Sequence, residues 1–539
     1  MPHTPLFQRF LRVLRQAQRA NCPARGVASC PPGVRAPWSR RHFIQTTALM
    51  GATGLVASVL PATRAAVRPG DVYRPPVIAI IGGGLAGLQA AYQLQQAGVY
   101  ATVYEACGRL GGRILSCPYG SGADVVADLG GEFINTDHAD MLRLAQVFGL
   151  RLFNRRQDAR RFPFPAVGFY LAGQRRTEAE VAAHLQPLAA QIAQDAARLE
   201  NDYGHVAPTL DMLSVTAYLD QHVDKIAAPF IRSLVEESIR TEYGVEPEAS
   251  SALQLISHLP AGQGQRFQGG GPSDETVVLE GGSSRLIQAL AQALAGQIHT
   301  HMALRRIAPQ GSGFRLEFVS GQVVEAEVVI LALPFPVLRE LEVQVPLPQR
   351  LWRFINEASL GVNEKLLMGF AKRIWRRADG FVMEAWADLG CSALWDETQR
   401  YPGREDGALT FFCGGRAVQS LQVGSTADQL ARLLGQFERF LPGAATAATG
   451  PAVRSHWTQN RLSGGSYSSF QPGQLTLFGD WLWSESDDPA QRQEVHVGNL
   501  VFAGEHVSAE FYGFMNGAAQ TGRLAAEYVL RRLAPQAPR

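Results

Sequence analysis

Residues 77–113 constrain the fold more than any other part of the chain, because strand, turn, helix and strand patterns follow one another there. An apolar run at 77–81 leads into a Gly-x-Gly-x-x-Gly turn, and a helical pattern continues to about residue 97. A second apolar strand, 100–104, ends on Glu105. This order is typical of a unit that binds a dinucleotide at the carboxyl end of its first strand.

Each glycine of such a turn has its own physical role. Gly82 permits the tight turn, Gly84 lets the backbone approach a pyrophosphate, and Gly87 lets the helix pack against the strand. The helix N-terminus then presents free N–H groups and its positive dipole end to the phosphates. Glu105 stands where an acid accepts hydrogen bonds from a ribose. We therefore expect an α/β fold that binds an ADP-containing cofactor.

A second glycine segment directly follows the acid and refines the choice of cofactor. It reads Arg109-Leu110-Gly111-Gly112-Arg113. A nicotinamide site does not need this segment, whereas two glycines between two arginines suit a second turn close to phosphates. The segment therefore favours FAD, bound in an extended conformation, over NAD.

These motifs, in this order, resemble the flavin-containing amine oxidase superfamily. That group includes monoamine oxidases, polyamine oxidases, L-amino acid oxidases and, more distantly, phytoene desaturases. The resemblance implies an FAD-binding Rossmann-type (GR2-like) domain with an interleaved α+β substrate-binding domain. It also covers the C-terminal region, where Gly504 and Glu505 follow an apolar strand and Gly517-Ala518 begin a helix. Glu505 is expected to accept a hydrogen bond from the ribityl or phosphate side of FAD.

The resemblance assigns further cofactor contacts residue by residue. A further pair of glycines, Gly130 and Gly131, follows Asp128, and we call this segment the second glycine turn; it is similar to the family segment beside the isoalloxazine. A strand near 302–305 is similar to the one beside the adenine. The additional cofactor-binding residues are Gly130, Gly131, Glu132, Leu304, Trp457 and Met515.

The segment 456–473 resembles monoamine oxidases most, and it implies the catalytic groups. In those enzymes the residue after Ser-Gly-Gly can be a cysteine bonded to the flavin, but here it is Ser466, so we expect non-covalent FAD. The two aromatic residues that face each other before the flavin correspond to Tyr467 and Phe514. Two flat walls can orient an uncharged amine. Lys365 corresponds to the lysine that holds a water near flavin N5; a partly exposed edge residue is the plain alternative.

The residues expected around the substrate favour an amine over an amino acid as the substrate. The expected reaction is hydride transfer from the amine α-carbon to the flavin, giving an imine that hydrolyses. An L-amino acid oxidase needs a cation for the substrate carboxylate, usually an arginine. In the similar segment of the snake-venom type that arginine stands where this chain has Phe133, and here Glu132 precedes it. Arg240 is the alternative carboxylate clamp, so an L-amino acid oxidase stays open, with a desaturase-like flavoprotein further behind. The electron acceptor is either O2, which yields H2O2, or a periplasmic carrier.

The N-terminus predicts export. Ser-Arg-Arg-His-Phe-Ile at 39–44 matches a twin-arginine motif, and a short glycine-containing apolar stretch precedes small residues suited to cleavage near Ala65 or Ala66. We expect the Tat translocase to carry the folded flavoprotein, which makes it periplasmic or secreted in a bacterium. Without the nine arginines of residues 1–66, the 50 basic residues become 41 against 48 acidic ones, a net charge of −7. That balance argues against nucleic acid as a partner.

The length of 539 residues suits two packed domains built from alternating segments. The expected divisions are a signal peptide, a linker, a first FAD-binding segment, a helical substrate-domain segment, a second FAD-binding segment, a substrate-domain sheet with helices, and a third FAD-binding segment with the aromatic pair. The signal peptide is 1–66 and the linker 67–76. The three FAD-binding segments are 77–150, 271–340 and 461–533, the helical substrate-domain segment is 151–270, and the substrate-domain sheet with helices is 341–460. No cysteine spacing indicates a metal site. A Cys391–Cys413 disulfide and a homodimer are left open.

Overall fold

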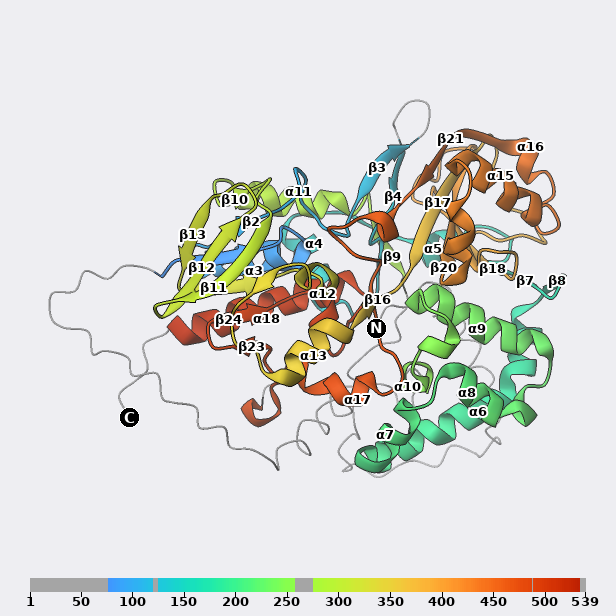
Figure 1. Cartoon of the computed structure of the whole chain (residues 1–539). Coiled ribbons are helices and arrows are strands. Elements are labelled where there is room, and N and C mark those ends of the chain that lie inside the picture. The colour runs from blue at the N-terminus through green and yellow to red at the C-terminus, as the bar shows by residue number, and fades with distance from the viewer. Residues whose placement is uncertain (1–75, 120–124, 257–274, 487, 534–539) are drawn as a thin grey trace, which may run out of the picture.

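The computed structural model describes residues 76–119, 125–256, 275–486 and 488–533. The predicted signal peptide at 1–66 and nearly all of the predicted linker lie outside the described residues. Figure 1 shows a sheet with its covering helices on one side, a second sheet with helices at the other side, and a group of helices below it.

A six-stranded sheet carries the dinucleotide turn. Its order is β10 (Ile298–His299), β2 (Thr102–Tyr104), β1 (Ile78–Ile81), β14 (Val328–Leu331), β24 (Leu500–Phe502) and β23 (His496–Val497). All neighbours are parallel except β24 and β23. Strands β1 and β14 are fully buried, as expected for a parallel sheet covered on both faces.

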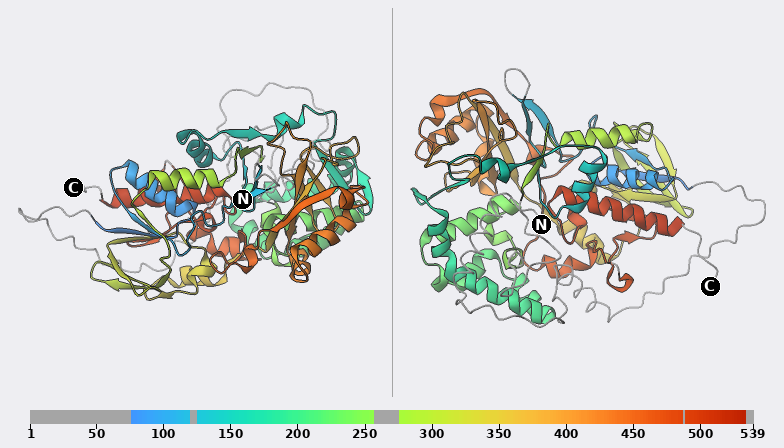
Figure 2. Two further views of the ribbon diagram at one scale, coloured as in Figure 1. Left: turned by 90° about the horizontal axis from the view of Figure 1, so that it is seen from above. Right: turned by 180° about the vertical axis from the view of Figure 1, so that it is seen from behind.

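Helices far apart in the sequence cover one face of this sheet. Helix α3 (Leu85–Gln96) follows β1, and the C-terminal helix α18 (Met515–Leu533) lies beside it in both further views (Figure 2). The contact is close, because a Cβ added at Gly522 of α18 would lie 2.3 Å from the carbonyl oxygen of Ala86. Helices α4 (Ala139–Val147) and α11 (Ser284–Ala293) pack against the same pair.

A four-stranded sheet extends the cofactor-side half. Its order is β13 (Val323–Ala326), β12 (Gly313–Phe318), β11 (Leu304–Gln310) and β15 (Glu342–Val343). Short two- and three-stranded sheets join the halves: β3 (Ser116–Tyr119) with β4 (Val125–Asp128), β16 (Ser359–Leu360) with β22 (Ser468–Ser469), and β5 (Phe133–Ile134), β9 (Val277–Leu279) and β6 (Leu152–Asn154).

The second half of the molecule is built on a seven-stranded sheet. Its order is β21 (Ala448–Arg454), β17 (Asn363–Phe370), β20 (Gly407–Gly414), β19 (Ala393–Asp396), β18 (Glu384–Ala387), β7 (Val167–Leu171) and β8 (Gln174–Arg176). Helix α15 (Thr426–Phe437) packs on β17 and β21 and begins with a capping box at Ser425. This α/β arrangement confirms the predicted fold class.

A group of helices completes the second half: α6 (Glu178–Asn201), α7 (Tyr203–Asp211), α8 (Val215–Gln221), α9 (Pro229–Tyr243) and α10 (Ala252–Ile256). Thr177 caps the long helix α6 by accepting from the backbone N–H of Glu180. Helices α13 (Gln349–Glu357) and α17 (Gln474–Phe478) lie between this group and the six-stranded sheet (Figure 1).

The segment 151–270, predicted to be mostly helical, begins with strands, and its residues 257–270 lie outside the described residues. β6, β7 and β8 occupy it before the first long helix begins at Glu178. Every residue of β7 is buried, because it pairs with β18 inside the seven-stranded sheet. A short buried strand has no alternating polar face, so its sequence alone does not separate it from a helix.

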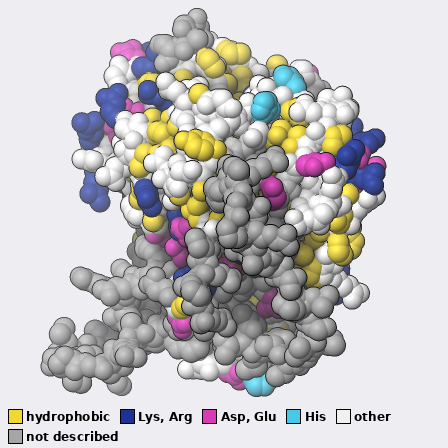
Figure 3. Space-filling view, turned by 90° about the vertical axis from the view of Figure 1, so that its left-hand side faces the viewer, with side chains coloured by type: hydrophobic (Ala, Val, Ile, Leu, Met, Phe, Trp, Pro, Cys, Tyr) yellow, Lys and Arg dark blue, Asp and Glu magenta, His cyan; other side chains and the backbone are white. Residues whose placement is uncertain are grey.

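The described surface carries both signs of charge. On the face drawn in Figure 3, basic side chains lie at both edges of the described surface, with acidic side chains next to them. Such mixing differs from the continuous basic face of a nucleic-acid-binding protein. None of the helices in the described ranges of the chain combines the length and apolar character needed to cross a bilayer.

Candidate active site

One cavity of about 750 Å³ lies at the carboxyl ends of the parallel strands and continues to the seven-stranded sheet. Open α/β sheets bind their ligands at this edge. All predicted site residues but one line it: Gly82, Gly84, Glu105, Arg109, Gly112, Arg113, Gly130, Gly131, Glu132, Leu304, Lys365, Trp457, Tyr467, Gly504, Glu505, Phe514 and Met515. Gly87 is the exception, since it packs behind the turn.

The first turn has the geometry that its glycines predict. Gly82 has φ +109°, and a Cβ there would lie 2.5 Å from the carbonyl oxygen of Ala332. A Cβ on Gly87 would lie 2.0 Å from the carbonyl oxygen of Gly82, so only glycine allows α3 to start against β1. The space beside Gly84 is open, with Gly112 as the nearest neighbour at 3.9 Å. That space fits a pyrophosphate at the start of α3.

Glu105 stands at the end of β2 with its carboxylate held by two backbone groups. Gly83 N donates to Oε2 at 2.6 Å, and Cys107 N donates to Oε1 at 2.8 Å. The carboxylate therefore faces the glycine turn from the adjacent strand. Leu304 and Met302 line the same end of the cavity. This arrangement fits the ribose and adenine of a dinucleotide.

Arg113 and Glu505 connect the two sequence-distant cofactor motifs directly. Arg113 donates to Glu505 at 2.6 Å and to the carbonyl oxygen of Ser466 at 2.9 Å. Glu505 also accepts from the Ser468 hydroxyl and from Gly513 N. Burial alone would raise the pKa of Glu505, but Arg113 and other neighbours outweigh it and lower the pKa. Glu505 is therefore an ionised carboxylate that fixes the loop before α18.

The flavin end of the cavity lies between the second glycine turn and α18. A Cβ on Gly131 would lie 2.8 Å from the Met515 side chain, so glycine is needed for these two segments to approach. Trp457 donates its indole N–H to the carbonyl oxygen of Leu129 at 2.7 Å, which fixes its ring. Nδ1 of His506 is buried and has no hydrogen-bond partner among the described residues, and His506 lines the cavity. These features fit a flat polar ring system such as that of FAD.

Lys365 lies on β17 with its ammonium fully engaged. Nζ donates to Glu132 Oε2 at 2.7 Å, to Asp128 O at 2.8 Å and to Gly130 O at 2.9 Å. An ammonium has three N–H groups, so a water near the flavin would have to share or replace one of these bonds. The structure puts Lys365 at the cavity wall, buried rather than at an exposed edge.

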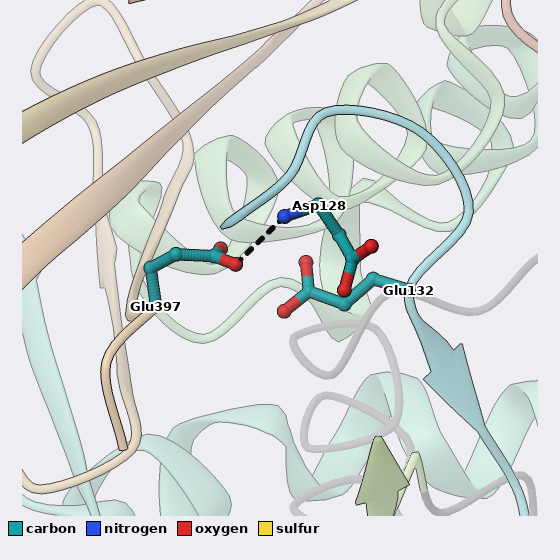
Figure 4. Close-up of side chains that lie close together, drawn as sticks. All are labelled: Asp128, Glu132 and Glu397. Atoms are coloured by element: carbon teal, nitrogen blue, oxygen red, sulfur yellow. Dashed lines mark hydrogen bonds between the residues drawn. The ribbon is translucent and has the colours of Figure 1, made fainter. Parts of the chain in front are cut away.

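Glu132 belongs to a buried acidic cluster with Asp128 and Glu397, whose carboxylates turn toward a common space (Figure 4). Arg400 pairs with all three, at 2.9 Å from Asp128, 2.7 Å from Glu397 and 3.5 Å from Glu132. The guanidinium thus supplies the positive charge that such a cluster requires. Burial, with Glu397 next to it, raises the pKa of Glu132 to about 7, against the opposing effect of Lys365 and Arg400.

Tyr467 and Phe514 line the cavity from different segments. The Tyr467 hydroxyl donates to the carbonyl oxygen of Thr241 at 2.9 Å. Burial and the nearby charge of Glu242 hold the pKa of Tyr467 well above its usual value, so the phenol stays neutral. Buried His138 packs against Phe514 in a T-shaped arrangement, with ring centroids 4.7 Å apart. Both rings are therefore fixed walls.

The structure bears on two alternatives that the sequence left open, the Arg240 carboxylate clamp and the Cys391–Cys413 disulfide. Arg240, the alternative carboxylate clamp, does not line the cavity; its guanidinium pairs with Glu237 at 2.7 Å and Glu246 at 2.8 Å. The clamp hypothesis for Arg240 is therefore wrong, because its side chain is already bound. Cys391 and Cys413 are buried free thiols.

Several residues that line the cavity carry no recognisable sequence signal. Glu275, Asn363 and Trp395 all line the cavity. Ser466 turns its hydroxyl toward Asn363 at 2.7 Å, and Trp395 donates its indole N–H to Glu397 at 3.2 Å. Glu275 comes two residues before the apolar strand β9, and an acid in that position is too common a pattern to indicate a site.

The fold and the cavity define a protein with a dinucleotide-type site, and comparison with known proteins gives the family. The family model for flavin-containing amine oxidoreductases matches residues 85–530, so the chain belongs to that family. It is a flavin-dependent oxidoreductase of the amine oxidase class, with FAD as its cofactor. The predicted family, FAD and enzyme class are thereby confirmed.

Individual relatives are distant in sequence but match most of the chain. Flavin-containing amine oxidase B of Canis lupus familiaris is 23% identical over 479 residues, covering 85% of this chain and 86% of the relative. The fold is similar to that of a putrescine oxidase bound to putrescine, with TM-score 0.70, 23% identity, and 85% and 99% coverage. It is also similar to cyclohexylamine oxidase from Brevibacterium oxydans, with TM-score 0.71, 22% identity, and 85% and 100% coverage.

Proposed function

We propose that this protein oxidises a small-molecule amine by transferring a hydride from the amine α-carbon to FAD. The observation that carries this proposal is the shared cavity: Lys365, Tyr467 and Phe514 line the same space as the dinucleotide turn at Gly82 and Gly84. FAD, when bound, supplies the acceptor for the hydride at flavin N5. The product imine then hydrolyses to a carbonyl compound and ammonia or an amine.

The protein residues act by binding and orientation. Tyr467 and Phe514 offer two apolar faces to an uncharged amine. Since Thr241 O fixes the Tyr467 hydroxyl, that ring cannot swing out of the cavity without losing a hydrogen bond. Phe514 has no hydroxyl, so this wall is less polar than a tyrosine pair. We assign Lys365 the positioning of a water, through the Nζ that also holds the second glycine turn.

The relatives and the charges at the site support an amine over an amino acid. The relatives are an amine oxidase B, a putrescine oxidase and a cyclohexylamine oxidase. An amino acid would bring its carboxylate close to Glu132 and Glu275, which both line the cavity. Arg240, the cation considered for that carboxylate, is bound elsewhere. An L-amino acid oxidase is therefore the second candidate.

Anaerobic mixing of the FAD-loaded protein with substrate panels tests the function. We expect primary and secondary amines to bleach the flavin absorbance, whereas L-amino acids of similar size should bleach it much more slowly. Faster bleaching by L-amino acids would replace the amine proposal with the second candidate, and no bleaching by either panel would contradict both. Admitting oxygen after reduction then distinguishes an oxidase, which forms H2O2, from an enzyme that needs a periplasmic acceptor.

The flavin is bound without a covalent link in this proposal, because Ser466 provides no thiol. Its hydroxyl oxygen lies 2.8 Å from Gly361 O and 2.7 Å from Asn363 Oδ1, and its single proton is donated to one of these two acceptors. We expect acid precipitation to release all of the FAD into the supernatant, measured by its fluorescence. Yellow colour in the washed protein pellet would contradict this.

A further inference from the structure

Glu275 is a buried acid that the function described above does not use. It lines the cavity and is only 3% exposed. Its backbone N–H donates to Asn135 Oδ1 at 2.8 Å, which fixes the position of its Cα shortly before β9. Its φ of +40° is uncommon for a side chain other than glycine. Such a conformation persists where the surrounding structure holds it, and it is frequent at ligand sites.

The carboxylate of Glu275 has an oxygen without a protein partner. Oε2 is buried and accepts no hydrogen bond from the described residues. A buried carboxylate without a hydrogen bond or counter-ion is costly. Since this oxygen belongs to a residue of the cavity wall, a ligand in the cavity is positioned to supply the missing donor.

The surroundings of Glu275 favour a positively charged donor. Burial, together with the charges of Glu242 and Glu384, raises the pKa of Glu275 well above its usual value. Arg155 opposes this effect, but its guanidinium pairs with Glu384 at 3.1 Å and lies over the Phe133 ring at 4.6 Å. The acids that act on Glu275 therefore outnumber the cation, and a cationic group in the cavity would relieve the mutual repulsion.

Glu275 and the aromatic ring of Tyr467 line the same cavity. Tyr467 donates to Thr241 O in the last turn of α9, where the helix dipole is negative. Glu242, the next residue, and Glu275 both act on the charge state of the Tyr467 phenol. Glu275 is thus close to the ring that we assign to the reacting amine.

We propose that Glu275 binds a second, cationic nitrogen of the substrate, so that the preferred substrates are diamines or longer polyamines. This inference rests on the proposed amine oxidation. One amine enters the aromatic walls uncharged and is oxidised, while the other remains an ammonium and donates to the Glu275 carboxylate. A monoamine, or a substrate with a carboxylate at its far end, lacks the cation that would ionise Glu275 and pair with it.

Matched linear substrates test the proposal on the FAD-loaded enzyme. Butylamine, 1,4-diaminobutane and 4-aminobutanoate, with their longer homologues, differ only in the far group. We measure the rate of flavin reduction against substrate concentration without oxygen. At the best chain length, the diamine should have at least a tenfold higher apparent second-order rate constant than the monoamine, and the amino acid analogue should have the lowest.

Glu275→Gln removes the charge and keeps the shape. It should reduce the apparent second-order rate constant for the diamine by about 30-fold or more, which is typical of removing one partner of a buried charge pair. The rate constant for butylamine should change by less than about threefold. Glu280→Gln is the control, because Glu280 lies outside the cavity and pairs with Arg151, yet loses the same charge.

The outcomes separate this inference from the proposed function. Equal use of diamine and monoamine by the wild type would overturn the role of Glu275 while leaving amine oxidation intact, as would an equal loss for both substrates in Glu275→Gln. Reduction by no amine would contradict the proposed function itself. If Glu275→Gln does not fold, the wild-type comparison of the three far groups decides the question.

Discussion

Lys365 combines a structural role with its predicted chemical one. Its three N–H groups hold Asp128, Gly130 and Glu132 against β17, and its side chain is almost fully buried. Removing one partner of such a buried pair costs about 3–5 kcal/mol, since the other charge stays behind. Any variant of Lys365 therefore tests stability and catalysis together unless the two are separated.

We expect Lys365→Met to slow flavin reduction or reoxidation by about a hundredfold, in the range found for losing one positioned donor. The melting temperature should fall as well, because Glu132 loses its closest cation. Stopped-flow absorbance gives the two half-reactions, and calorimetry gives the stability.

The double variant Lys365→Met with Glu132→Gln separates the effects. Removing the carboxylate charge should restore much of the stability, because no unpaired ion remains. The half-reactions should stay slow. A return of both half-reactions to wild-type rates in the double variant would remove Lys365 from the mechanism.

Glu132 gives the stability a specific pH dependence. Its pKa is raised to about 7 in the folded protein, so the folded state holds this proton more tightly than the unfolded chain does. The contribution of this bound proton to the free energy of unfolding is complete below the unfolded pKa of 4.5 and is lost as the pH rises through the folded pKa of about 7. The difference in unfolding free energy between Glu132→Gln and wild type should therefore shift in favour of the variant by up to about 3 kcal/mol as the pH rises from about 4.5 to 8, whatever its value at low pH. Denaturant titrations across this range measure it, and a constant difference would contradict it.

At the scale of elements, α3 can start against β1 only because Gly87 has no side chain. Gly87→Ala would place a Cβ 2.0 Å from the carbonyl oxygen of Gly82, and backbone cannot move aside as a side chain can. We expect a loss of about 3 kcal/mol or more and weak FAD retention on gel filtration.

Gly435→Ala is the matched control for that substitution. Gly435 lies in α15 with nothing within 4 Å of an added Cβ. Alanine there should stabilise by about 0.5–1 kcal/mol through its higher helix propensity. A Gly87→Ala protein with normal FAD content and wild-type stability would show that α3 can shift away from the turn.

The sequence predicted those elements whose function imposes a local pattern. The turn at Gly82, the second glycine turn at Gly130 and the start of α18 each require glycine for close backbone contact, so their signals are short and specific. The strand β7 was missed, because burial in the middle of a sheet removes its alternation. Glu275 was missed for another reason: its meaning depends on neighbours such as Glu384, which is distant in the sequence.

At the scale of the whole molecule, we expect export through the twin-arginine route. Replacing Arg40 and Arg41 by lysine should keep the protein in the cytoplasm with FAD still bound, because the motif lies outside the cavity-forming residues. Fractionation with flavin fluorescence measures both properties. Exported protein in the double-lysine variant, or cytoplasmic wild type with an intact N-terminus, would contradict the prediction.

The strand order of the six-stranded sheet has a consequence for protein synthesis. β1 pairs with β14, where Ile78 lies opposite Val328, and β14 pairs with β24 near the end of the chain. The cavity residues Met515 and Ala518 lie in α18, which is translated after the other cavity-lining segments. Such long-range pairing makes folding slow, and the first glycine turn has no complete binding site while the ribosome is still elongating the chain. We therefore expect FAD capture to follow the synthesis of α18 rather than that of the first glycine turn.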